Sequence, residues 1–169
     1  MRTKTSMAVW VELTILVLTT GVMHLSAGVE GAAHSIVVIV NSSNPVESLT
    51  IGDLRKIFLA ERSQWDSGRV ITPVMLATQA PERTSFLKTV CGMDDAAFEK
   101  YFLRVSFSGK TVALPKEVGT ARDVEAVVIN SPGAIGFVRA EDFQGQTAVK
   151  AVKIDGLRAV DVGYRLKMR

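Results

Sequence analysis

The stretch from Ile36 to Trp65 reads IVVIVNSSNPVESLTIGDLRKIFLAERSQW and carries the clearest structural signals of the chain. It opens with five consecutive β-branched residues, Ile36 to Val40. Such a run is typical of a strand buried on both faces, as in a parallel sheet with helices above and below it. Periodicity alone leaves open a buried helical turn of the same length, but β-branching favours the strand.

A capped amphipathic helix follows the strand. Thr50, with Asp53 three residues later, forms an N-terminal capping pattern. Four apolar residues then recur at helical spacing and predict one buried face: Ile51, Leu54, Ile57 and Phe58. Core packing accounts for these residues whatever the protein does.

Length and composition indicate one globular domain. The chain has 169 residues, of which 47% are hydrophobic and 22% are charged. The net charge of +3 is too weak to indicate a nucleic-acid partner, and no basic stretch is interleaved with aromatic residues. We therefore expect no nucleic-acid binding.

Residues 1–33 have the pattern of a secretory signal peptide. Arg2 and Lys4 precede a largely apolar stretch, Met7 to Leu25, and small residues follow it. Cleavage after Ala33 or after Ala27 fits this pattern, and a retained membrane anchor is the alternative. We expect a periplasmic or secreted protein whose domain comprises residues 34–169.

The sequence offers little catalytic or metal-binding chemistry. Cys91 is the single cysteine, so no internal disulfide can form. If residues 1–33 are removed, His34 is the single histidine, and its terminal position makes it a poor partner for a catalytic thiol. We expect no enzyme activity, no cofactor and no metal site built from histidine and cysteine.

The rest of the chain alternates between predicted strands and helices, which indicates an α/β architecture with a mixed sheet. Pro81 suits the first turn of a helix that Gly92 ends, and Gly136 inside a strand predicts close approach by another group. We predict strands over 70–76 and 134–138, and a hairpin in which 149–154 and 157–162 flank the turn Asp155-Gly156. We predict later helices that begin at residue 81, at residue 94 or 95, and at residue 116, and the last of these ends at residue 130.

The order of these motifs resembles the second lobe of the substrate-binding proteins of phosphate ABC transporters. In that family a strand ending in Asn-Pro leads to a helix of the form Leu-Thr-x-x-x-Leu-x-x-Ile-Phe, and a tryptophan follows. The matching residues here are Asn44-Pro45, Leu49-Thr50, Leu54, Ile57-Phe58 and Trp65. Two later segments are also similar to the family's, 131–137 (SPGAIGF) and 149–156 (VKAVKIDG). The resemblance implies a type 2 periplasmic binding protein-like fold, mainly one lobe.

The resemblance also implies where an anion would bind. The family presents Ser-Gly-Thr at a helix N-terminus with an arginine nearby, a placement that uses free backbone N–H groups. The corresponding residues here, Ala80-Pro81-Glu82, do not match. Arg83, Thr84 and Ser85 lie one turn further on and are the candidate ligand-binding residues. The alternative is that Arg83 is a solvated side chain and that the other two are ordinary helix residues.

Two functions of different class remain open from the sequence. The first is a secreted solute-binding protein that binds phosphate or another small anion and serves the permease of an ABC transporter. The second is a non-transport envelope module that reuses the lobe to contact another envelope protein. The lack of the second lobe predicts exposed apolar surface, which favours the second function.

Overall fold

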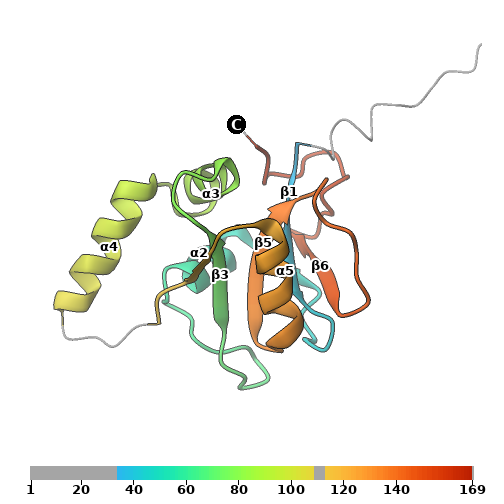
Figure 1. Ribbon diagram of the computed structural model, residues 1–169, viewed down its shortest axis with the longest axis horizontal. Coiled ribbons are helices and arrows are strands. Elements are labelled where there is room, and N and C mark those ends of the chain that lie inside the picture. Colours follow the sequence, from blue (N-terminus) through green and yellow to red (C-terminus); the bar gives the residue numbers. More distant parts are fainter. Residues whose placement is uncertain (1–33, 109–112, 169) are drawn as a thin grey trace, which may run out of the picture.

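In the computed structural model, which describes residues 34–108 and 113–168, one mixed sheet forms the centre of the molecule (Figure 1). The strands lie in the order β2-β6-β1-β5-β3-β4. Their bounds are β1 Ile36–Asn41, β2 Ser48–Leu49, β3 Thr72–Leu76, β4 Lys116–Val118, β5 Ala134–Arg139 and β6 Val149–Ile154. The predicted α/β class with a mixed sheet is confirmed.

Strand β1 is fully buried, as its β-branched sequence predicts. Its neighbours differ from the expectation, because β1 pairs antiparallel with both β5 and β6. Parallel pairing occurs instead between β3 and β4, between β3 and β5, and between β2 and β6. Burial on both faces therefore comes from the central position of β1, whatever the direction of its partners.

Helices cover both faces of the sheet. Alternate residues of β1 point to opposite sides, so that Val38 belongs to one core cluster and Ile39 to the other. The larger cluster packs the sheet against α2 (Ile51–Phe58), α3 (Pro81–Phe86) with its continuation η1 (Leu87–Cys91), and α4 (Asp95–Phe107). The smaller cluster packs it against α5 (Ala121–Asn130). In Figure 1, α4 lies beside α3 at one end of the molecule.

Local signals set most helix boundaries. Thr50 and Asp53 form the expected capping box at α2. Pro81 is the first residue of α3, and Gly92, with φ of 71°, ends the continuous α3–η1 segment. Asp94 caps α4 by accepting from the backbone N–H of Ala97 at 2.8 Å.

Two predicted elements are wrong in part. The helix expected over 116–130 is strand β4 followed by α5, and a second capping box, Thr120 with Asp123, marks the true helix start. At Asp155-Gly156 both turn residues have the expected positive φ, 51° and 80°. The segment 157–162 forms turns, however, and only Leu157 bridges back to Ile154.

Two glycines at strand β5, Gly133 and Gly136, lie in close contact with neighbouring elements. A Cβ at Gly136 would lie 2.4 Å from Cγ1 of Val124, which confirms the predicted close approach. The carbonyl of Gly133 accepts from Nε1 of the buried Trp65 at 3.0 Å. Trp65 therefore ties the loop after α2 to the start of β5.

The predicted signal peptide, residues 1–33, lies outside the described residues and stays a prediction. Within 34–108 and 113–168, no helix has the length and hydropathy that a membrane crossing requires.

Candidate functional site

Arg83 is the centre of the candidate site, and its side chain is fully buried (0% exposed). It extends from α3 to the edge of the sheet where β3 ends and β4 runs alongside. Its Nη1 donates to the carbonyl of Leu76 at 3.0 Å and to Oε1 of Glu117 at 2.5 Å. Its Nε donates to Oδ1 of Asp95, also at 2.5 Å. The alternative that Arg83 is a solvated side chain is therefore wrong.

The other two predicted ligand-binding residues differ in their surroundings. Thr84 is exposed and donates from its hydroxyl to Oδ2 of Asp95 at 3.3 Å, so it shares one carboxylate with Arg83. Ser85 is buried on another side of the helix turn. Anion binding by the three residues stays a prediction, and the geometry brings two of them together around a carboxylate.

The guanidinium of Arg83 faces two carboxylates and one aromatic ring. Asp95 and Glu117 together carry twice its charge, and the ring of Phe98 lies 5.7 Å from its central carbon. Its second terminal nitrogen, Nη2, is buried and has no hydrogen-bond acceptor among the residues that the structure describes. An unpaired buried donor is costly in a folded protein and points to an acceptor supplied from elsewhere.

A second arginine takes a similar arrangement at the start of α3. Glu82 is buried and its carboxylate accepts from Nε of Arg139, at the end of β5. Arg139 also donates to Glu141 at 3.3 Å. Burial lowers the pKa of Arg139, but the hydrogen bonds and charges of Glu141 and Glu82 outweigh it and raise the pKa above its ordinary value. An internal carboxylate thus occupies the position beside the helix start where the resemblance would place an anion.

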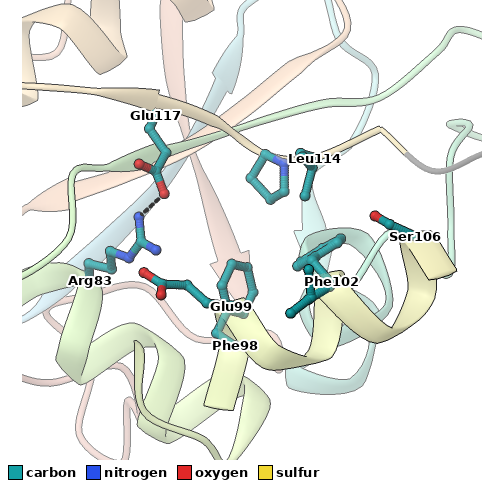
Figure 2. A pocket seen from close by; sticks show the side chains of 9 residues that line it. Arg83, Phe98, Glu99, Phe102, Ser106, Leu114 and Glu117 are labelled. Atoms are coloured by element: carbon teal, nitrogen blue, oxygen red, sulfur yellow. Dashed lines mark hydrogen bonds and ion pairs between the residues drawn. The ribbon is translucent and has the colours of Figure 1, made fainter. Parts of the chain in front are cut away.

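A cavity of about 400 Å³ adjoins the Arg83 cluster. It lies between α4 and the segment 113–117 (Figure 2). Its walls are mostly apolar, with two carboxylates and one hydroxyl among them. The lining residues are Arg83, Phe98, Glu99, Phe102, Leu103, Ser106, Leu114, Pro115 and Glu117.

Large apolar side chains are exposed in the cavity lining and beside it at the end of α4. Leu103 is 59% exposed, Leu114 is 61% exposed, and Phe107, one turn after Leu103 on α4, is 84% exposed. Exposed apolar side chains are therefore present on α4 and on the segment before β4.

Sequence reasoning missed the acidic residues that form ion pairs with Arg83. The sequence pattern gives Asp95 no role beyond the start of a helix and places Glu117 inside the helix predicted over 116–130. Both contacts join residues that are distant along the chain, and no local pattern reports such pairs. Arg139 was missed for the same reason.

Other chemistry is limited in the described part of the chain. No group of three or more His, Cys, Asp or Glu side chains there is placed to hold a metal ion. Cys91 is buried, and burial raises the pKa of its thiol to about 12, so the nucleophilic thiolate is scarce at neutral pH.

Comparisons with known proteins identify the fold. No family model matches the chain, and no curated protein matches it. Among solved structures, it is similar to a protein of Clostridium perfringens that is described as a phosphate ABC transporter substrate-binding protein and was solved with bound phosphate. The two sequences are 20% identical, the TM-score is 0.61, and the match covers 76% of this chain and 48% of that one.

Two further structures agree. They are an ABC-type phosphate transport receptor of Vibrio cholerae (18% identity, TM-score 0.61, 76% and 49% covered) and PstS of Borrelia burgdorferi (14% identity, TM-score 0.57, 77% and 53% covered). This chain has the fold of phosphate ABC transporter substrate-binding proteins. It spans about half of their length, and the resemblance read from its motifs is confirmed at the level of the fold.

Proposed function

We propose that this protein is a secreted envelope module that uses one lobe of the phosphate-binding fold to contact a partner, without carrying free phosphate. The periplasmic or secreted location rests on the predicted signal peptide. One observation carries the proposal: Arg83 and Arg139, the arginines beside the start of α3, are each paired with two carboxylates.

The charge balance around these arginines opposes an added anion. Each cluster has an excess of one negative charge, counting one guanidinium against two carboxylates. Two like unit charges about 4 Å apart repel by about 4 kcal/mol at an effective dielectric constant of about 20. Phosphate would have to displace Glu82 or Glu117, or lie beside them. Pro81 also removes one backbone N–H from the helix start.

The exposed apolar side chains on α4 and on the segment before β4 supply the contact surface. Leu103 and Leu114 line a cavity whose wall also contains the buried rings of Phe98 and Phe102. Phe107 follows Leu103 one turn later, at the end of α4. Apolar anchors next to a cavity are the usual centre of a protein–protein contact. Catalysis is not part of the proposal.

Site-specific crosslinking tests this function. A photoreactive residue at position 103 should crosslink, in cells that secrete the protein, to a discrete envelope protein. The matched control places the same residue at position 162, where Val162 is almost completely exposed (99%) and is not among the residues that line the cavity. Equal crosslinking from both positions, or none from position 103, would contradict the proposal.

A second candidate is anion binding by Arg83, Thr84 and Ser85, in a protein that delivers phosphate or another small anion to an ABC permease. Two observations favour it: Nη2 of Arg83 lacks an acceptor within the described part of the chain, and the fold is similar to that of phosphate-binding proteins. Calorimetric titration with phosphate separates the two candidates, because only an anion-binding protein would give a saturable heat.

A further inference from the structure

The geometry of the α4 cavity points to a specific ligand chemistry. We propose that it binds the free amino terminus of a peptide whose first side chain is apolar, a group that combines an ammonium, a neutral carbonyl and an apolar side chain. This inference rests on the proposed function, since it names the part of the partner that the module recognises.

The apolar side chain of the ligand is matched by the larger part of the wall. Phe98 and Phe102 line the cavity with their rings, and Leu103, Leu114 and Pro115 complete it. In Figure 2, Phe102 and Leu114 face Arg83 and Glu117 across the cavity. A volume of about 400 Å³ lies in the range of small-ligand sites and accommodates one large side chain with its backbone atoms.

The carbonyl of the ligand is matched by Arg83. Its buried Nη2 has no acceptor among the described residues, and Arg83 is part of the cavity wall. Because Asp95 and Glu117 already offset the charge of the guanidinium, a third carboxylate would meet net repulsion. A neutral carbonyl oxygen supplies the missing acceptor without adding charge.

The ammonium is matched by two carboxylates. Glu99 and Glu117 both line the cavity, so the wall carries two negative charges against the one positive charge of Arg83. A cavity with low-dielectric walls and a negative excess attracts a cation. Capture of an amino terminus by fixed polar groups is a known mode of peptide recognition.

A matched set of small probes tests the inference on the full chain as expressed and processed. L-Phenylalaninamide carries all three groups. N-Acetyl-L-phenylalaninamide lacks the charge, N-acetyl-L-phenylalanine is an anion, and glycinamide lacks the ring. Binding is followed by NMR titration of the labelled protein, with backbone signals reporting the location.

We expect L-phenylalaninamide to bind most tightly and to shift signals of α4 and of residues 113–117. Glu99 is exposed, and Glu99→Gln should weaken the binding of this probe about two- to fivefold, as expected for the loss of one exposed charge pair. The same substitution should leave the affinity for N-acetyl-L-phenylalaninamide unchanged. Glu61→Gln, an exposed carboxylate outside the cavity wall, is the control and should change neither.

Two results would overturn the inference: tighter binding of the anionic probe, or no saturable shift in α4 with L-phenylalaninamide. In either case a crosslink confined to position 103 would leave the proposed function standing. Loss of that confined crosslink together with normal probe binding would instead contradict the proposed function alone.

Discussion

Replacing Arg83 by methionine tests how much the buried cluster contributes to stability. Methionine keeps much of the volume of the side chain and removes its charge and donors. The change eliminates three hydrogen bonds, to Asp95, Glu117 and the carbonyl of Leu76. It also eliminates the unpaired Nη2, which returns part of the loss.

The size of the effect follows from the exposure of each partner. The side chain of Glu117 is 51% exposed and regains water, so its pair contributes at most about 1 kcal/mol. The side chain of Asp95 is only 20% exposed, and its charged hydrogen bond contributes about 1.5–3 kcal/mol. The Leu76 carbonyl adds about 1 kcal/mol. After the gain from removing Nη2, we expect the free energy of unfolding to fall by about 2–4 kcal/mol.

Urea denaturation followed by circular dichroism measures this difference. Arg104→Met is the matched control, because Arg104 is exposed on α4, and it should change the free energy of unfolding by less than about 0.5 kcal/mol. Asp95→Asn should cost less in the Arg83→Met background than in the wild type. A loss at Arg83 no larger than that at Arg104 would refute the role given to this cluster.

Three further predictions concern the core. Gly136→Ala should lower the free energy of unfolding by about 1–3 kcal/mol, because the added Cβ would overlap Val124. In a thermal melt, adding Val124→Ala to this variant should restore part of the lost stability. Burial raises the pKa of Tyr164, whose hydroxyl donates to the carbonyl of Ile36 at 2.8 Å. The stability that the raised pKa contributes is complete below the unfolded pKa of about 10 and is lost as pH rises from there toward the raised folded pKa. Tyr164→Phe should therefore flatten the fall in the free energy of unfolding that denaturation measures above about pH 10, and should change nothing below about pH 9. Cys91 should resist maleimide at neutral pH in the folded protein and react in urea, as mass spectrometry would show, whereas rapid native labelling would contradict its burial.

Sequence reasoning succeeded where the signal is local. The β-branched run of β1 and the capping box of Thr50 with Asp53 are both complete within a few residues. The same rule would have found the start of α5, because Thr120 and Asp123 repeat that capping box. Strand β4 is too short and too polar for any pattern to reveal, and its pairing with β3 defines it.

The failed hairpin has a long-range cause. Beyond its pairing with β1, strand β6 pairs with β2 through Lys153 and Ile154, and the backbone N–H of Asp155 donates to Leu49. Strand β2 therefore already occupies the edge of β6 with which a strand returning from the turn would have to pair. The segment after the turn instead closes on itself, with the backbone N–H of Arg158 donating to Asp161 at 2.8 Å.

Only part of the candidate site could be predicted from the sequence, because its contacts also join residues that are distant along the chain. The resemblance points to Arg83, Thr84 and Ser85 because they lie one turn after the segment that corresponds to the family's anion-binding loop. The state of Arg83 depends on Asp95 and Glu117, which α4 and β4 bring to it from later in the chain. Only the folded arrangement shows that two carboxylates offset the charge of Arg83, which disfavours binding of free phosphate there.

Calorimetric titration with phosphate tests that central claim most directly. The wild-type protein should give no saturable heat at millimolar phosphate, because Arg83 and Arg139 are already paired. Glu82→Gln combined with Glu141→Gln removes both carboxylates from Arg139 and should produce weak, millimolar binding of phosphate. Saturable binding to the wild type at micromolar phosphate, abolished by Arg83→Met, would contradict the account.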